Sequence, residues 1–533
     1  MDFVWRDEAI TGGVAVSREA AGTGRAGAEH VQARPGAYAD SVTLMQVSAQ
    51  AQAVDGVRAA LVAMATDLNL RLLDGLGLAA PPGVGEHDLL VAIKADDGMS
   101  LAAALAVVEA GLENRSAQPG AEDTGREFPP RTTSSAIARS GPGIVLVSVP
   151  GQYACTEAMD ALARGCDVMI FSDNVSVAEE IALKDHAAER GLLVMGPDCG
   201  TAIVGGVGLG FANSVRRGPI GLVAASGTGA QQLSCLLDAA GSGCSAVLGL
   251  GGRDLSAAVG GRSARAALAA LDADPDTELI VLLSKPPDAR VAHDLRSYAD
   301  TLSTKVQFAL VGRGQPDLTR AAETALAAIG CPAPDWPRWT PVDGSGPSAG
   351  APRGGGALRG LFAGGTLCDE AMIIAAGALG PVYSNVPLEP GTEVDPRLPA
   401  SERPPEATHV MIDFGADELT TGRPHPMIDQ RLRLDQLALE AADPATAVIM
   451  LDVVLGFGAH ADPAADLAPA IAAARSRHGG QVVVSLVGTP ADPQGLDGQA
   501  AAFVQAGAHV FASNAQAARF ACELIAGQAG GVR

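Results

Sequence analysis

Two short segments place hydroxyl side chains and glycines where an apolar run meets a helical pattern. Residues 226–228 read Ser-Gly-Thr after the apolar run 220–225, and residues 364–366 read Gly-Gly-Thr after 359–363. A helix start presents free N–H groups and the positive end of the helix dipole, which together bind phosphate or carboxylate. The alternative is an ordinary N-cap, which needs a single side-chain oxygen. The predicted anion-binding residues are Ser226, Gly227, Thr228, Gly364, Gly365 and Thr366.

An arginine at another predicted strand end could hold a second anionic group. Gly252, Arg253 and Asp254 follow the apolar run 246–250 and are candidates for binding phosphate or substrate. A guanidinium there can bind phosphate or carboxylate through two parallel hydrogen bonds. Alternatively, Arg253 pairs with Asp254 in a surface turn.

The segment TGRPHPMID combines a cation, an imidazole and a carboxylate between two prolines. These are Arg423, His425 and Asp429. His425 could act as general acid to a departing amide nitrogen, because the ordinary pKa of histidine lies near working pH. Its imidazole could also accept a phosphoryl group. The alternative is a histidine that caps a turn.

Five further polar residues follow predicted strands, where open α/β sheets bind ligands. Asp452 is a candidate catalytic carboxylate and Asp413 a candidate substrate-binding carboxylate, and the alternative for both is a helix cap. Lys285 could neutralise an acyl phosphate, or could be an ordinary solvated lysine. His460 lies in the loop after Asp452, and Asn174 would shape the ligand-binding edge. The carboxylates show no EF-hand or HExxH spacing, so no metal site is predicted.

The chain alternates strands and helices over most of its length. Uninterrupted apolar runs predict strands covered on both faces, and therefore parallel sheets. The predicted strands of the central part are 143–149, 167–173, 192–196, 220–226, 246–252, 279–285 and 306–312. Those of the last part are 359–365, 408–415, 447–458, 482–488 and 509–513.

Two polar stretches without periodicity divide the chain. The predicted organisation is an N-terminal tail 1–35, a small α/β domain 36–113, a linker 114–141, a Rossmann-type half domain 142–216, a flavodoxin-like domain 217–331, a linker 332–357 and a second flavodoxin-like domain 358–533. In the small domain we expect strands at 40–49 and 88–95 and helices at 54–73 and 100–112, and the two β-then-α units suggest a ferredoxin-like fold.

Composition narrows the class of protein. The 533 residues carry a net charge of −23, which disfavours nucleic acid and anionic membranes as partners. No apolar run approaches the roughly 20 residues that a membrane helix needs. The start of the chain lacks the basic and apolar regions of a signal peptide, and the eight cysteines are scattered without a CxxC pair. A cytoplasmic protein with reduced thiols is therefore expected.

Several of these motifs resemble a known superfamily. In 142–330, GPDCGTAI, GPIGLVAASGTGAQQL and VLGLGGRDL resemble the succinyl-CoA synthetase α-subunit. In 358–530, GGTLCDEA, HVMIDFGAD and AVIMLDVVLGFG look like the carboxy-terminal ligase domain of the β-subunit. The strings VPGQYACTEAMDAL, IFSDNVSVAEE, MGPDCGTAI, GRPHPMID and DVVLGFGAHADPA are similar to the FdrA family. Members of that family are often called acyl-CoA synthetases, and some act as the large subunit of oxamate carbamoyltransferase.

The resemblance implies that two helix N-termini face each other and hold a phosphate. It also reveals departures from the synthetases. No histidine occurs in 306–330, where the synthetases carry a phosphohistidine, and SKPPDAR replaces a Gly-rich turn at 284–290. No ATP-grasp domain is visible, and the first Gly-rich CoA-binding turn is missing before residue 142, which argues against CoA as a cofactor.

These departures favour phosphate and carbamoyl phosphate as substrates. The expected reaction is oxalurate plus phosphate giving oxamate plus carbamoyl phosphate, in a hetero-oligomer with accessory subunits. One alternative is an NDP-forming acyl-CoA synthetase in which His425 or a partner supplies the phosphohistidine. The other is a non-catalytic scaffold that only binds anions.

Overall fold

The computed structural model describes residues 14–19, 27–35, 37, 39, 41–85, 88–113, 130–341, 356–398, 402–404, 408–420, 423–478 and 480–527. The chain forms two compact units. The first comprises Met1–Phe128 with Thr421–Pro424, and the second comprises Pro129–Thr420 with His425–Arg533. The predicted α/β class is confirmed in both units.

The first unit is a four-stranded antiparallel sheet in the order β1-β2-β4-β3. Its elements are β1 Val14–Glu19, β2 Ala28–Arg34, α1 Ser41–Gln52, β3 Val57–Met64, α2 Asp67–Gly75, β4 Leu89–Ala95 and α3 Gly98–Glu113. The run β2-α1-β3-β4-α3 follows a ferredoxin-like order, and β1 occupies the edge beside β2. In that fold, this edge strand normally comes last in the chain.

Several predictions for this unit are wrong. Two strands, β1 and β2, lie in the predicted tail 1–35. The predicted strand 40–49 is helix α1, in which Leu44, Val47 and Ala51 are buried at helical spacing. The predicted helix 54–73 is instead strand β3 followed by α2. Gly56, at φ +82, and Thr66, which caps α2 through the Asn69 N–H, mark the two ends of β3.

The second unit begins with a three-stranded parallel sheet in the order β5-β6-β7. Its elements are α4 Thr133–Ser140, β5 Ile144–Val147, α5 Gly151–Ala163, β6 Asp167–Ile170, α6 Val177–Ala188 and β7 Val194–Met195. Helix α4 lies within the predicted linker 114–141, so that part of the prediction is wrong. Residues 114–129 of the same linker lie outside the described residues.

A six-stranded sheet follows in the order β13-β12-β10-β11-β8-β9. Strands β10 to β13 are parallel, and β8 and β9 add an antiparallel hairpin. The bounds are β8 Thr201–Val204, β9 Val207–Gly210, β10 Arg217–Ala224, α7 Gly227–Ala239, β11 Cys244–Gly249, α8 Arg262–Asp272, β12 Leu279–Ser284, α9 Ala289–Ala299, β13 Lys305–Leu310 and α10 Leu318–Ala328.

The last sheet has seven strands in the order β14-β20-β19-β18-β15-β17-β16. Its elements are β14 Arg338–Trp339, β15 Ala357–Phe362, α11 Gly365–Leu379, β16 Val382–Tyr383, β17 His409–Asp413, α12 Asp417–Thr420, α13 Arg431–Ala442, β18 Thr446–Val454, α14 Pro463–His478, β19 Gln481–Val487, α15 Leu496–Gln505, β20 His509–Phe511 and α16 Asn514–Ala526. Strand β14 and the buried Trp336 lie in the predicted linker 332–357, which is therefore packed in this part. Residues 342–355 lie outside the described residues.

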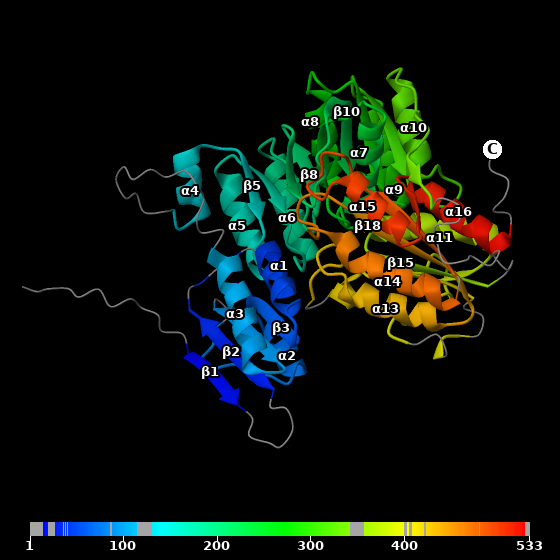
Figure 1. Cartoon of the computed structure of the whole chain (residues 1–533). Helices are drawn as coiled ribbons and strands as arrows, with labels where there is room; N and C mark the ends of the chain where they lie inside the picture. The colour runs from blue at the N-terminus through cyan, green and yellow to red at the C-terminus, as the bar shows by residue number, and fades with distance from the viewer. Residues whose placement is uncertain are drawn as a thin grey trace, which may run out of the picture. The chain divides into compact units, whose positions relative to one another are not determined.

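Both larger sheets have the same winding. Strand β10, which leads into helix α7, lies between β11 and β12. Strand β15, which leads into helix α11, lies in the same way between β17 and β18. In both sheets the chain therefore continues on one side of this strand and later returns to its other side. This is the topological switch point at which doubly wound sheets bind ligands. Helices α7 and α11 begin at the two switch points, and they contact each other and the pair α10 and α16 (Figure 1).

In the part of the chain that the structure describes, no helix combines the length and apolar character needed to cross a bilayer.

Candidate functional site

The first turns of α7 and α11 are in direct contact. The hydroxyl groups of Ser226 and Thr366 share a hydrogen bond of 2.6 Å. Close by, a Cβ placed on Gly364 would lie 2.8 Å from Oγ1 of Thr228. The two segments that the sequence singled out as anion-binding, 140 residues apart, therefore form one site.

Backbone donors at this junction remain unpaired. Ser226 Oγ accepts the N–H of Gly229 at 3.0 Å, and Gly364, the N-cap of α11, has no side chain to cap its helix. The N–H groups of Gly227, Thr228, Gly365 and Thr366 have no acceptor among the described residues. Two helix dipoles thus direct their positive ends to one place, as an oxyanion requires.

Lys285 adds a full positive charge beside α11. It follows β12, and its Nζ forms an ion pair with Asp369 Oδ2 at 2.8 Å. Burial alone would lower the pKa of Lys285, but Asp369 and then Asp413 outweigh this effect and raise it above the ordinary value. A Cβ on Gly365 would lie 3.5 Å from Lys285 Nζ, which places the ammonium at the helix start.

Asp413 lies at the same helix start. It ends β17, and its Oδ1 accepts the N–H of Gly415 at 2.9 Å. A Cβ on Gly365 would lie 2.7 Å from Asp413 Oδ2. Burial raises the pKa of this carboxyl to about 7, although Lys285 and the Gly415 N–H act in the opposite direction. The structure therefore brings the predicted residues Lys285 and Asp413 together with α11.

His425, in the loop before α13, lies near Gly415 and Asp413. A Cβ on Gly415 would lie 2.9 Å from His425 Nε2 and 3.2 Å from Asp413 Oδ1. His425 Nδ1 accepts the N–H of Met427 at 3.2 Å, so the ring proton of the neutral form is on Nε2. Burial, and then the charge of Arg433, lower the pKa of His425 to about 4. The expectation of a pKa near working pH, on which its general-acid role depended, is wrong.

The low pKa of His425 predicts how stability depends on pH. The ordinary value is 6.5, so the unfolded chain binds more protons than the folded chain between about pH 4 and 6.5. The contribution of His425 is therefore complete above about pH 6.5 and is lost as the pH falls towards 4. At about 1.4 kcal/mol per pKa unit, this amounts to at most about 3.5 kcal/mol. Urea unfolding at pH 7 and pH 4.5 should show a smaller pH-dependent loss in His425→Gln than in the unsubstituted chain; equal losses would contradict the assignment.

Asp452 supports the turn before α11. It is fully buried within β18, and its two carboxylate oxygens accept the N–H groups of Ala363 at 2.7 Å and Gly364 at 2.8 Å. The buried Arg433 lies 3.3 Å from Asp452 Oδ1 and also donates to the Asp452 carbonyl. Both carboxylate oxygens are thus engaged, and the prediction that Asp452 is catalytic is wrong: it positions the turn. Arg433 was not predicted, because nothing in the local sequence links α13 to β18.

Replacing Asp452 with alanine should destabilise the fold strongly. The change leaves a buried guanidinium and two backbone donors without their acceptor, which costs about 3–5 kcal/mol. Asp466→Ala is the matched control, because its carboxylate is partly exposed and contacts only His460 at 3.3 Å in the described ion pairs. We expect a change within about 0.5 kcal/mol there. Equal effects of the two changes in chemical denaturation would refute the positioning role.

The comparisons with known proteins agree with this architecture. A family model described as CoA-ligase matches residues 361–524. YahF of Escherichia coli K12, an uncharacterized protein, is 39% identical over 515 residues, covering 92% of this chain and 98% of YahF. The chain belongs to the family of YahF. The match to the CoA-ligase model and the likeness to succinate–CoA ligase α-subunits place it in the succinyl-CoA synthetase-like superfamily.

The matches to more distant relatives cover a smaller share of both chains. The succinate–CoA ligase α-subunit of Aquifex aeolicus is 27% identical over 160 residues, which is 29% of this chain and 51% of that subunit. Among solved structures, a dinucleotide-forming acetyl-coenzyme A synthetase of Ca. Korarchaeum cryptofilum is 14% identical, with 78% of this chain and 90% of that chain covered. Its TM-score of 0.29 is too low to bear on the site.

A second family model, the heavy metal-associated domain of AllF, matches residues 27–128. Thiolates are the ligands that soft metals prefer, and the first cysteine of the chain is Cys155. In the described part of this unit, no group of three His, Cys, Asp or Glu side chains is arranged to hold a metal ion. The residues present do not fit a heavy-metal site.

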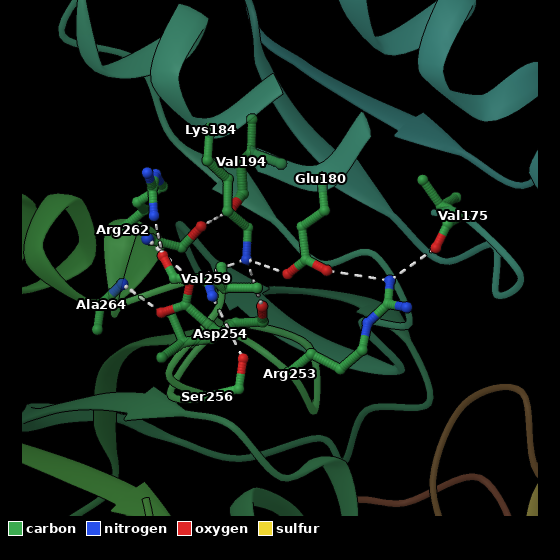
Figure 2. A network of polar contacts seen from close by, with 12 residues as sticks. Val175, Glu180, Lys184, Val194, Arg253, Asp254, Ser256, Val259, Arg262 and Ala264 are labelled. Carbon is green, nitrogen blue, oxygen red and sulfur yellow. Dashed lines mark hydrogen bonds and ion pairs between the residues drawn. The ribbon is translucent and has the colours of Figure 1, made fainter. Parts of the chain in front are cut away.

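Arg253 and Asp254 belong to a separate polar network (Figure 2). Asp254 is fully buried, contacts Lys184 Nζ at 2.8 Å and accepts two N–H groups at the start of α8. Lys184 also pairs with Glu180 at 2.7 Å, and Arg253 lies 3.0 Å from Glu180 and donates to the Val175 carbonyl. The prediction that Asp254 binds substrate is wrong, because both of its oxygens are used within the fold. The pairing of Arg253 with Asp254 in a surface turn is wrong as well.

The remaining predicted residues make their contacts elsewhere. Gly252 lies in the turn beside Asp198, and Asn174 is exposed with φ +55. His460 Nε2 lies 3.3 Å from Asp466 Oδ2. Arg423 is exposed and groups with the first unit, so its place at the site stays a prediction.

Proposed function

We propose that this chain is the acyl-transferring subunit of an enzyme that binds an acyl phosphate where α7 and α11 begin. The observation that carries the proposal is the Ser226–Thr366 hydrogen bond, which joins two helix N-termini beside the Lys285 ammonium. Donors fixed in place before reaction stabilise a phosphate leaving group without reorganisation. Accessory subunits and a cytoplasmic location are part of this proposal.

Membership of the CoA-ligase superfamily supports an acyl-CoA synthetase as the complete activity. In this version the acyl phosphate reacts with CoA, and a partner subunit handles the nucleotide. The proposal needs a phosphoryl carrier that the partner also supplies. His425 is poorly suited to that task, since its Nδ1 accepts the Met427 N–H and its Nε2 therefore carries the proton rather than a lone pair.

A second candidate, direct carbamoyl transfer, needs no phosphohistidine. The proton on Nε2 of His425 therefore does not stand against it. Inorganic phosphate can attack a bound ureido carbonyl without any phosphohistidine, so a site with helix dipoles and Lys285 is sufficient in principle. Oxalurate and phosphate would give oxamate and carbamoyl phosphate. The resemblance of 142–330 and 358–530 to FdrA proteins, some of which act in oxamate carbamoyltransferase, supports this candidate.

Two assays on the full-length chain, purified with its partner subunits, separate the candidates. Acyl-CoA formed from a carboxylate, CoA and ATP selects the synthetase, and carbamoyl phosphate formed from oxalurate and phosphate without nucleotide selects the carbamoyltransferase. In either case Thr366→Val should reduce the rate at least tenfold, because it removes a hydroxyl from the junction. Activity in neither assay, or an unaffected Thr366→Val variant, would overturn the proposal.

A further inference from the structure

A carboxylate oxygen at the start of α11 makes no hydrogen bond within the described residues and is not fully enclosed by the fold. The Asp413 side chain is 6% exposed, and Oδ1 is held by the Gly415 N–H. Oδ2 makes no hydrogen bond to any described residue. It faces the first residue of the helix, because a Cβ on Gly365 would lie 2.7 Å from it and 3.5 Å from Lys285 Nζ. Asp413 is thus largely buried as a residue, while Oδ2 stays open to a ligand at the helix start.

We infer that Asp413 Oδ2 is the proton carrier of acyl transfer at this site. The inference rests on the proposed function. The acceptor loses its proton to Oδ2 as its nucleophilic atom forms a bond to the acyl carbon. The bond between that carbon and the phosphate oxygen breaks, and the electron pair leaves with the oxygen. The proton then passes from Oδ2 to the departing phosphate, which leaves as monohydrogen phosphate, and Asp413 is again a carboxylate.

The surroundings of Asp413 suit this task. Four charged or titratable groups face it from different elements: Lys285 after β12, Asp369 on α11, Asp452 on β18, and His425 in the loop before α13. Burial, reinforced by Asp369 and Asp452 and opposed by Lys285, brings the carboxyl pKa to about 7. A group with such a pKa exchanges protons most effectively near neutral pH.

The alternative is a purely structural role, in which Asp413 only fixes the turn at Gly415 through Oδ1. Asp413→Asn separates the two roles, because the amide keeps an oxygen acceptor for the Gly415 N–H and cannot carry a proton. Asp276→Asn is the matched control, since Asp276 is a mostly exposed carboxylate whose described partner is Arg217 at 3.0 Å.

The test uses the full-length chain with its partner subunits, acetyl phosphate or carbamoyl phosphate as donor, and CoA or oxamate as acceptor. We expect kcat of Asp413→Asn to fall about a hundredfold or more, with loss of the rise in kcat through about pH 7. Its affinity for inorganic phosphate, measured by calorimetry, should stay within about threefold of the unsubstituted chain, and Asp276→Asn should match that chain throughout.

An unchanged kcat and pH profile in Asp413→Asn would overturn the inference while leaving the proposed function in place. A fall in kcat matched by an equal loss of phosphate affinity would also overturn it, because Asp413 would then act in binding. Failure of the unsubstituted chain to bind phosphate would instead overturn the proposed function itself.

Discussion

Lys285→Ala is expected to lower kcat/KM for acyl transfer about a hundredfold or more. The ammonium is a full positive charge at the start of α11, and the loss of one preorganised donor to a developing oxyanion costs about 3–4 kcal/mol. The change also leaves the Asp369 carboxylate without its ion pair beside the proposed phosphate site. Both consequences weaken binding of the leaving group in the transition state more than they disturb the fold.

The same substitution should shift a pH profile in a defined direction. Lys285 lowers the pKa of Asp413, so its removal raises that pKa further, and any rise in activity assigned to Asp413 should move to higher pH. Lys305→Ala is the control, because Lys305 is an exposed lysine on the neighbouring strand β13. Steady-state kinetics of both variants check the prediction. A Lys285→Ala enzyme within twofold of the unsubstituted chain would remove Lys285 from the site.

Gly364→Ala should abolish activity and weaken the packing of the two ligase-type domains. The added methyl group would lie 2.8–2.9 Å from Oγ1, Cβ and Cγ2 of Thr228, and such overpacking costs about 1–3 kcal/mol. The backbone itself is not the obstacle, since Gly364 has φ −106 and ψ 111, which alanine adopts without strain. The effect therefore measures the contact between α7 and α11.

Two further variants make this prediction specific. Gly377→Ala lies on the same helix with nothing within 4 Å, so it should stabilise the protein by about 0.5–1 kcal/mol. Thr228→Gly removes all three atoms that the new methyl group would meet, so it should restore the stability of Gly364→Ala without restoring full activity. Thermal unfolding and kinetics of the single and double variants provide the check. A Gly364→Ala protein as stable and active as Gly377→Ala would show that the helix starts do not touch.

The parallel sheets were predictable because their strands are continuous apolar runs, a pattern that few other structures share. Glycines and hydroxyls at two predicted helix starts indicated 226–228 and 364–366 as anion-binding segments, whereas their meeting in one place was implied by the resemblance to the succinyl-CoA synthetases. In the first unit the sequence misled. The Ala-rich stretch 54–73 favours helix by propensity, yet burial of Val62 and Met64 against β4 makes its first half a strand.

The incorrect site assignments have a common cause. Asp254 and Asp452 looked available because their partners are remote in the chain: Lys184 lies 70 residues from Asp254, and Arg433 lies 19 residues from Asp452. His425 looked titratable near neutral pH because its burial is set by the tertiary fold. Residue type and strand position indicate where a side chain is anchored, whereas its partners and burial decide whether it can react.

The central claim is tested most directly by solving the structure of the full-length chain crystallised with millimolar phosphate. The account predicts tetrahedral density within hydrogen-bonding distance of backbone N–H groups at the starts of both α7 and α11 and of Lys285 Nζ. Phosphate that binds at only one helix start, or at neither while the Ser226–Thr366 junction stays intact, would contradict it.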